Sequence, residues 1–336
     1  MTGDLLKHHF PGRGPAPSSS QAGSASGPTG DGAALSHIRD QHVVSQVLLK
    51  RFTVPGSRSS GRRLTKFNLE RPEGTHKLKP PKACAYDEDF VPVDSVSIEN
   101  LWARTEQRAP QVFRAIDRGN PFAEAAHASI LRDLISIHFV RSFRYKKIHQ
   151  ESFHRVYQNL RDNMLGRRKE LVRAEALRQT GLHLPDVALP AFLDPILEES
   201  LPAKGFASGQ LFRQNIEEMF NKVRDLIATW QPELLTAKTG QFIIGDNPAI
   251  PVRFDPNNPN APAYNMAIGD AHSVVLPLGP RHLVALGPQQ LTAEVEKPVV
   301  ERLNQLQVLA AYRHVFFKPD QGTERFVRMA CQLRSS

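Results

Sequence analysis

Residues 41–52 read QHVVSQVLLKRF, and this stretch is where the folded part of the chain begins. Ser45 suits the N-cap of a helix, because its hydroxyl can accept a hydrogen bond from a free N–H of the first turn. Leu48 and Phe52 would then lie one turn apart on the same face. Arg51 would fall in the last turn, where a cation favours the negative end of the helix dipole. The stretch therefore predicts a short helix with one buried face.

His42 lies just outside this helix, near its free N–H groups. Two interpretations are open. The histidine can bond the backbone and fix the entry turn, or it can act as a general base or ligand toward a molecule bound at the helix mouth. The first is favoured, because no partner for the histidine is visible in the sequence.

The composition is that of an ordinary soluble protein. The 336 residues are 40% hydrophobic and 23% charged, with a formal net charge of +9. The positive charge permits nucleic acid or another acidic partner without requiring one. No apolar run has the length of a membrane span, and the first ten residues lack the pattern of a signal peptide. The two cysteines have no metal-ligand spacing, and a cytoplasmic protein is the expectation.

Residues 1–36 are predicted to form a disordered tail, because most of them are Pro, Gly, Ser, Ala and Thr. Residues 37–333 are predicted to form one α+β domain. It would have a small N-terminal strand element, a central helical layer at about 93–230, and a mostly antiparallel sheet at about 234–333. In the strand element, residues 64–69 alternate so that Thr65, Phe67 and Leu69 share a face.

A long helix is predicted from about Asp94 to residue 116, on the spacing of its apolar residues. Glu99 and Glu106 lie on it seven residues apart, and therefore nearly on one side. Two carboxylates on one flank can bind a divalent cation or pair with arginines. Pairing is the commoner outcome, and Glu106 is kept as a candidate metal ligand.

Asn120-Pro121 predicts the start of the next helix, with asparagine as the cap and proline in the first position. His138 falls on the buried stripe of that helix, where a histidine is usually a core residue with its hydrogen bonds made. Arg141 flanks the stripe at the edge of the core, where an arginine often holds a carboxylate. Glu106 is the partner that we expect for Arg141.

Residues 144–178 are helical in pattern and strongly basic, with ten lysines and arginines against four acidic residues. They form either a solvated helix with i,i+4 ion pairs or a ridge that faces phosphates. In the second case the candidate substrate-binding residues are Arg144, Lys147, Arg167 and Arg168. Arg144 and His149 also fit an Arg-x4-His pattern, which resembles the motif of the helical HEPN ribonucleases that act on RNA without metal.

The last part of the chain begins with a connection at 182–208, which carries four prolines and is predicted to be a mobile loop or a crossing between layers. A helix at 211–230, a strand at Gln241–Gly245 and a hairpin around Gly279-Pro280-Arg281 are expected to follow. A further helix is predicted over Val299–Arg313, and a last strand over Val315–Phe317.

Asp246-Asn247-Pro248 follows the first of these strands. Asp and Asn before Pro form turns through their own side-chain bonds. A carboxylate held rigidly at a strand end also suits a metal ligand or a general base. Both interpretations stay open on the sequence alone.

The opening run and this Asp-Asn-Pro carry a resemblance to a known family. Its pattern is His-x-Val-Pro-Gln-x-x-Leu-x-Arg-Phe, which is matched by His42, Val44, Gln46, Leu49, Arg51 and Phe52. Ser45 stands where the pattern has proline. Over roughly residues 37–318 the chain resembles the large, mostly bacterial family of unknown function catalogued as forty-two thirty-eight. The resemblance implies a similar Glu pair and an arginine placed like Arg141, but no known activity.

Three functional hypotheses follow. The first is metal-assisted phosphodiester hydrolysis of nucleic acid, with His42 as base or ligand, Glu106 and Asp246 on a divalent metal, and Arg141 as a clamp. In it, Gln46 and Asn247 would contact the substrate. The second is a non-catalytic binding or scaffold protein, in which His42, Glu106 and Asp246 form a structural hydrogen-bond network. The third is a metal-independent ribonuclease that uses Arg144 and His149. The first requires His42, Glu106 and Asp246 to converge.

Overall fold

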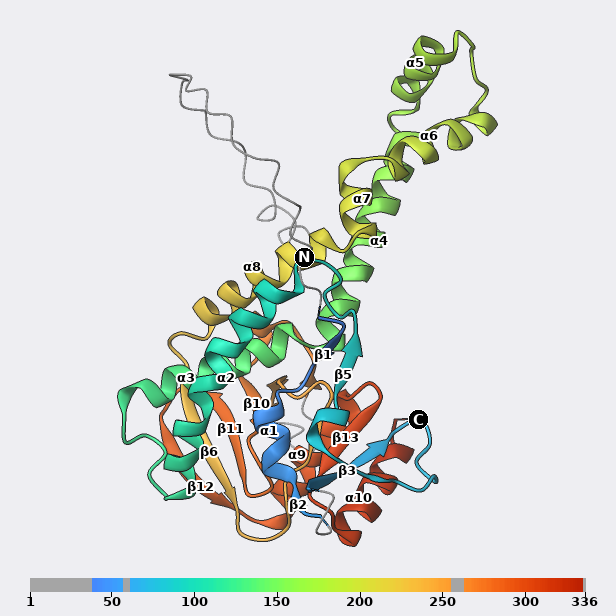
Figure 1. Ribbon diagram of the computed structural model, residues 1–336. Coiled ribbons are helices and arrows are strands. Elements are labelled where there is room, and N and C mark those ends of the chain that lie inside the picture. The colour runs from blue at the N-terminus through green and yellow to red at the C-terminus, as the bar shows by residue number, and fades with distance from the viewer. Residues whose placement is uncertain (1–37, 57–60, 255–262, 335–336) are drawn as a thin grey trace, which may run out of the picture. The chain divides into compact units, whose positions relative to one another are not determined.

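The computed structural model describes residues 38–56, 61–254 and 263–334. The disordered tail predicted for residues 1–36 lies outside this part of the chain. The fold is α+β, as predicted: it has short N-terminal strands, a layer of helices, and a C-terminal sheet that is mostly antiparallel (Figure 1).

The opening stretch forms a strand and then a very short helix. β1 (Asp40–His42) pairs antiparallel with β5 (Tyr86–Glu88). α1 (Gln46–Leu49) and the 3-10 helix η1 (Lys50–Phe52) follow it. The face predicted from spacing is fully buried, with Leu48, Leu49 and Phe52 at 0% exposure. The predicted hydroxyl cap is wrong: Ser45 occupies the N-cap position, but its side chain caps no N–H of the helix.

A second, five-stranded sheet lies beside this stretch. Its order is β2-β3-β13-β7, and β4 also pairs antiparallel with β3, at Leu64 and Thr65. The predicted strand is confirmed, since Thr65, Phe67 and Leu69 are all buried. The strands are β2 (Val54–Pro55), β3 (Arg62–Asn68), β4 (Leu78–Lys79), β7 (Ile244–Gly245) and β13 (His314–Phe317), and the 3-10 helix η2 (Pro81–Ala83) precedes β5.

The helical layer consists of α2 (Ser95–Asp117), α3 (Ala125–Val140) and α8 (Gln210–Leu226). Their apolar faces join the opening stretch and the inner face of the C-terminal sheet in one large core. The predicted start of α3 at Asn120-Pro121 is wrong, and the helix begins at Ala125. The Pro121 carbonyl instead contacts the buried His127 ring, at 2.9 Å from Nδ1, which holds residues 121–124 in a turn.

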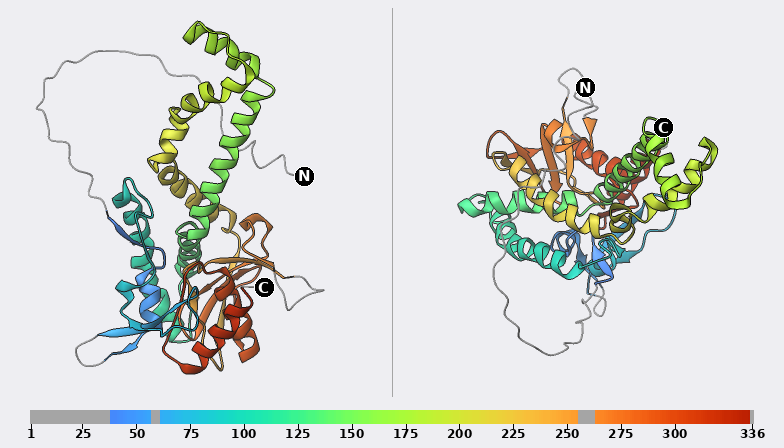
Figure 2. Two further views of the ribbon diagram at one scale, coloured as in Figure 1. Left: turned by 90° about the vertical axis from the view of Figure 1, so that its right-hand side faces the viewer. Right: turned by 90° about the horizontal axis from the view of Figure 1, so that it is seen from above.

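The basic segment is two helices rather than one. α4 (Phe143–Leu165) ends at Gly166, and α5 (Lys169–Thr180) follows. Of the two interpretations of 182–208, the mobile loop is wrong, because the segment contains η3 (Asp186–Ala188), α6 (Leu189–Glu198) and α7 (Leu201–Ala207). Two of its prolines sit in the first turns of α6 and α7, where the missing N–H costs nothing. Figures 1 and 2 show α5 and α6 at the far end of α4.

The C-terminal sheet has the order β12-β6-β11-β10-β8-β9, and only the β12–β6 pair is parallel. The predicted hairpin is confirmed as β10 and β11. The strands are β6 (Gln231–Ala237), β8 (Ile250–Arg253), β9 (Ala263–Tyr264), β10 (Ser273–Pro277), β11 (His282–Gly287) and β12 (Leu291–Val295), and the 3-10 helix η4 (Ile268–Asp270) precedes β10.

α9 (Lys297–Ala310) covers the outer face of this sheet and α10 (Gln321–Gln332) lies against α9. Of the strand predicted at Gln241–Gly245, only the last two residues are a strand. The preceding backbone binds α9 instead: Ile243 N–H donates to Asn304 Oδ1 at 3.0 Å. The final strand is present at the predicted place.

Candidate functional site

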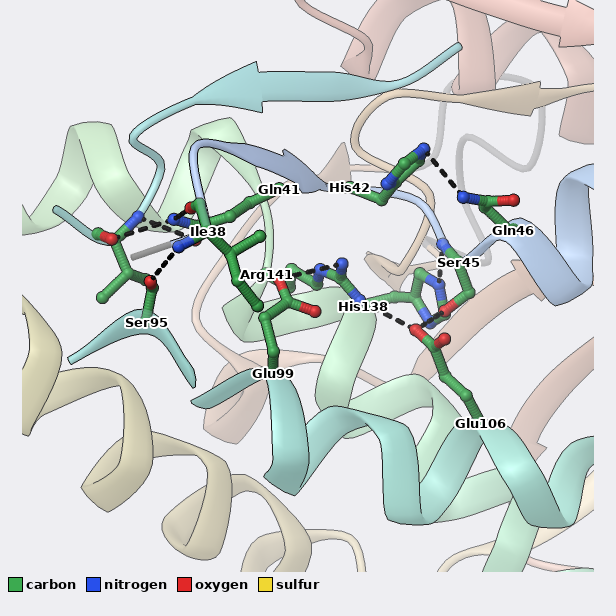
Figure 3. Close-up of polar contacts among 11 residues, drawn as sticks. Ile38, Gln41, His42, Ser45, Gln46, Ser95, Glu99, Glu106, His138 and Arg141 are labelled. Carbon is green, nitrogen blue, oxygen red and sulfur yellow. Dashed lines mark hydrogen bonds and ion pairs between the residues drawn. The ribbon is translucent and has the colours of Figure 1, made fainter. Parts of the chain in front are cut away.

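Ser45 ties the opening stretch to the helical layer. Its backbone N–H donates to His138 Nε2 at 3.1 Å, and its hydroxyl donates to Glu106 Oε1 at 2.6 Å (Figure 3). His138 Nδ1 lies 2.7 Å from the carbonyl of Leu134. Because Nδ1 donates, Nε2 is the acceptor, and the imidazole is neutral. His138 is therefore the satisfied core histidine that the sequence predicts.

Protonation of His138 should couple pH to stability. Burial lowers its pKa to about 4. An unfolded histidine titrates near 6.5, so between these values the unfolded chain binds a proton that the folded chain does not. Stability should therefore decrease as pH falls, by roughly 2 kcal/mol from this residue between pH 7 and pH 5. Urea unfolding of wild type and His138→Gln at both pH values measures it, and equal pH dependence in the two proteins would contradict it.

Arg141 is the buried cation of this region, with 3% of its surface exposed. Its Nη1 lies 2.8 Å from Glu106 Oε1 and its Nη2 lies 3.5 Å from Glu99 Oε1. Its guanidinium also stacks over Trp102 at 4.2 Å. The predicted Arg141–Glu106 ion pair is confirmed, and both glutamates on this flank of α2 pair with Arg141. Burial raises the pKa of Glu99, and the charge of Arg141 acts in the opposite direction.

His42 and Gln46 contact each other, with their Nε2 atoms 3.2 Å apart (Figure 3). Burial lowers the pKa of His42, and the charge of Arg141 lowers it further. A neutral imidazole results, which could accept a proton. His42 has no hydrogen bond or ion pair with Glu106 or Asp246, although the charge of Glu106 opposes the lowering of its pKa.

Asp246 is buried and bound to backbone. Its Oδ1 accepts from Tyr312 N–H at 2.7 Å, and its Oδ2 accepts from Arg313 and His314 N–H at 2.8 and 2.9 Å. Burial raises the pKa of this carboxyl, while the three N–H donors act in the opposite direction. The carboxylate therefore holds the turn before β13, which is the structural interpretation of the motif.

Asn247 also has protein partners. Its amide donates to the carbonyl of Ala310 at 3.2 Å and to Oδ1 of Asn265 at 3.3 Å. Arg144 donates to the carbonyl of that same Asn265. These two candidate substrate-binding residues thus fix the chain before β10.

The donors predicted for a divalent metal do not form a set. Glu106 is engaged by Ser45 and Arg141, and Asp246 by three backbone N–H groups. Within the described ranges, no three His, Cys, Asp or Glu side chains gather in a way that could hold a metal ion. The residues present therefore do not fit the metal that the first hypothesis requires.

The other candidates are spread along α4. His149 Nδ1 contacts the amide of Asn215 at 3.0 Å and its ring lies against Phe206, whereas Arg144 turns to Asn265. The two residues of the Arg-x4-His pattern thus have different neighbours. Arg167 and Arg168 are exposed between α4 and α5, roughly 30 Å of helix from the start of α4.

Lys147 lies at the other end of α4, beside a hollow of about 400 Å³. Four α4 side chains line it with the helical spacing that puts them on one face. The remaining walls come from β5 and from the turn before β13. The lining residues are Asp87, Phe143, Lys146, Lys147, Gln150, Tyr312 and Arg313.

The charges around this basic hollow are unequal. It has three cations and one carboxylate, Asp87, which lies 3.4 Å from Lys146 Nζ and 3.3 Å from Arg313 Nη1. Arg313 also stacks over the Phe143 ring at 4.7 Å. The arrangement has a net positive charge beside two aromatic rings, and can bind an anion with a planar apolar part.

The two sequence motifs support this hollow from two sides. β1 of the opening stretch pairs with β5 and places Gln41 opposite Asp87. Asp246 holds the backbone of Tyr312 and Arg313. The sequence named Lys147 but missed Asp87, Tyr312 and Arg313, because no local pattern marks them. Only the α4 spacing of Phe143, Lys146, Lys147 and Gln150 could have indicated a shared face.

Comparison with known proteins adds a family but no activity. In the described part of the chain, none of the helices has both the length and the apolar character that crossing a bilayer requires. Neither curated proteins nor solved structures gave a match. Residues 40–321 match the family described as protein of unknown function (DUF4238). Since this match covers most of the chain and includes both motifs, the protein belongs to the DUF4238 family.

Proposed function

We propose that this protein binds nucleic acid, and that the basic hollow takes the sugar–phosphate backbone with a base against its aromatic rings. The observation that carries the proposal is the grouping of Lys146, Lys147 and Arg313 around one hollow with Phe143 and Tyr312. Phosphate contacts by lysine and arginine supply most non-specific affinity for nucleic acid, and aromatic rings stack on unpaired bases.

The proposal is for binding, with His42, Glu106 and Asp246 in structural roles. Glu106 and Asp246 have partners within the protein that would have to be broken before either could act on a substrate. Removing one partner of a buried ion pair, such as Glu106 with Arg141, costs about 3–5 kcal/mol. Moving the Asp246 carboxylate would leave three backbone N–H groups without their acceptor. This favours the binding hypothesis over hydrolysis.

Lys147 offers the cleanest test, because 60% of its side chain is exposed and its contact with Glu151 is a long one, at 3.8 Å. We expect Lys147→Glu to weaken binding of a labelled single-stranded RNA about tenfold at low salt, without loss of stability. The slope of log affinity against log salt should become shallower by about 1. Fluorescence anisotropy over a salt series measures both.

Lys222→Glu is the matched control, since Lys222 is a half-exposed lysine on α8 in the same kind of i,i+4 pair. It makes the same charge change and does not line the hollow. Equal losses in the two variants, or no salt-dependent binding by wild type, would overturn the proposal. A denaturing gel of the same oligonucleotide after incubation with Mg²⁺ separates binding from hydrolysis, because binding alone leaves it intact.

A further inference from the structure

A second hollow lies between the C-terminal sheet and the N-terminal half of α9. It encloses about 310 Å³ and shares no lining residue with the basic hollow. This volume is at the lower end of the range for small-molecule sites, roughly 300–1,000 Å³. None of the motifs in the sequence points to it.

The hollow exists because three small residues on β10 and β11, Ser273, Ala285 and Gly287, lie on one face of the sheet. Val275 lies opposite Ala285 in the β10–β11 pair, so Ser273 and Gly287, two residues further on, share their face. Val275 and Ala285 belong to the core cluster that α9 covers with Val300 and Leu303. Beyond that cluster the serine and glycine are too small to fill the space under α9.

Two polar groups in this hollow lack partners. Glu233 lies on β6 opposite Ala285, and its backbone pairs within the sheet, but its carboxylate makes no hydrogen bond or ion pair with any residue in the described ranges. Burial raises the pKa of its carboxyl. The hydroxyl of Ser273 is buried and also has no partner there. A Cβ on Gly287 would come within 1.8 Å of Glu233 Oε1, so the carboxylate lies directly over this glycine.

The charged group without a partner in this hollow is therefore the Glu233 carboxylate, which is negative. Arg302 and His272 also line it, but Arg302 has an interaction of its own. The rest of the lining is mainly apolar, with Leu235, Val275 and Leu303 among it. A carboxylate beside apolar walls favours a ligand that brings a positive charge on an apolar body, because each part then replaces water with a matched surface.

We propose that this hollow is a binding site for a small apolar molecule with a primary ammonium group, which pairs with Glu233. The ammonium has three N–H donors, and the Ser273 hydroxyl, which lines the same hollow, can accept a hydrogen bond. The apolar body lies against Leu235, Val275 and Leu303. Gly287 is part of the site, because any side chain there would displace the carboxylate.

Hexylamine, hexanol and hexanoate are suitable probes, since they differ only in the head group. An amide NMR titration of wild type should give saturable shifts for hexylamine around residues 233, 273 and 285–287, and weaker binding for hexanol. Glu233→Gln keeps the shape and removes the charge, and should weaken hexylamine at least tenfold while leaving hexanol unchanged. Glu294→Gln on β12 is the control, because Glu294 is exposed and does not line the hollow.

Binding of hexanoate as strong as that of hexylamine, or equal hexylamine affinity in wild type and Glu233→Gln, would overturn the proposal. So would the absence of saturable binding up to the solubility limit of the amine. If Glu233→Gln does not fold, wild type still provides a test: hexylamine should bind less tightly as the pH is lowered and Glu233 is protonated. The nucleic-acid affinity of Glu233→Gln should equal that of wild type, so the two proposals can fail separately.

Discussion

Asp246→Ala is expected to lower the free energy of unfolding by about 5 kcal/mol, close to the whole stability of many domains. The carboxylate is 1% exposed and accepts three backbone N–H groups, from Tyr312, Arg313 and His314. Hydrogen bonds to a charged group contribute about 1.5–3 kcal/mol each, and unpaired N–H groups left in the core add their own cost. Urea unfolding of purified protein measures the loss.

Asp246→Asn separates the charge from the shape. It keeps one side-chain oxygen as an acceptor, so we expect roughly half the loss of the alanine variant. Asp270→Ala is the control, because Asp270 is exposed and should change stability by less than about 0.5 kcal/mol. A stable Asp246→Ala, within about 1 kcal/mol of wild type, would show that the turn before β13 does not depend on this carboxylate.

The same aspartate should affect ligand binding at a distance. Tyr312 and Arg313 line the basic hollow, and Asp246 holds their backbone. If Asp246→Asn remains folded, its affinity for single-stranded RNA should fall although the residue does not line the hollow. Such a loss would identify Asp246 as a positioning residue for the proposed binding.

Arg141→Met is the second large effect that we expect, with a loss of about 4 kcal/mol. The substitution keeps the apolar stem beside Trp102 and removes the charge that pairs with Glu99 and Glu106. Two partly buried carboxylates are then left without their cation, and the glutamates would have to take up protons on folding. Arg141→Lys should restore only part of the stability, because an ammonium can neither contact both glutamates as a fork nor stack on the indole.

A combined variant distinguishes a lost ion pair from lost packing. Adding Glu99→Gln and Glu106→Gln to Arg141→Met should recover part of the stability, since the uncompensated charges are gone. Arg104→Ala is the control on the same helix, because Arg104 is exposed and should have little effect. If the triple variant is as unstable as Arg141→Met, the interpretation of the cluster as a charge-balanced unit is wrong.

The parts of the fold that the sequence predicted are those that depend on a few neighbouring residues. The buried face of the opening helix, the alternation at Thr65 and Phe67, and the β10–β11 hairpin all follow from helical or strand periodicity. The Arg141–Glu106 pair was also predictable, because each residue lies at the edge of a helical stripe whose direction the spacing fixes. The errors at Ser45 and Asn120-Pro121 have the opposite origin, because other contacts replaced a good local cap. The Ser45 hydroxyl donates to Glu106, which is distant in sequence, and the Pro121 carbonyl contacts the buried His127 ring.

The sequence by itself determined which faces of the helices and strands are buried, the α+β class and the family motifs. Only the tertiary structure decided what the polar residues of those motifs do. Asp246 meets residues 312–314 rather than His42, and Asp87 meets Arg313 from 226 positions away. The physical reason is the distance along the chain over which each feature is set. Periodicity expresses backbone geometry that repeats within a turn, whereas the partner of a carboxylate depends on how whole elements pack, which no local spacing records.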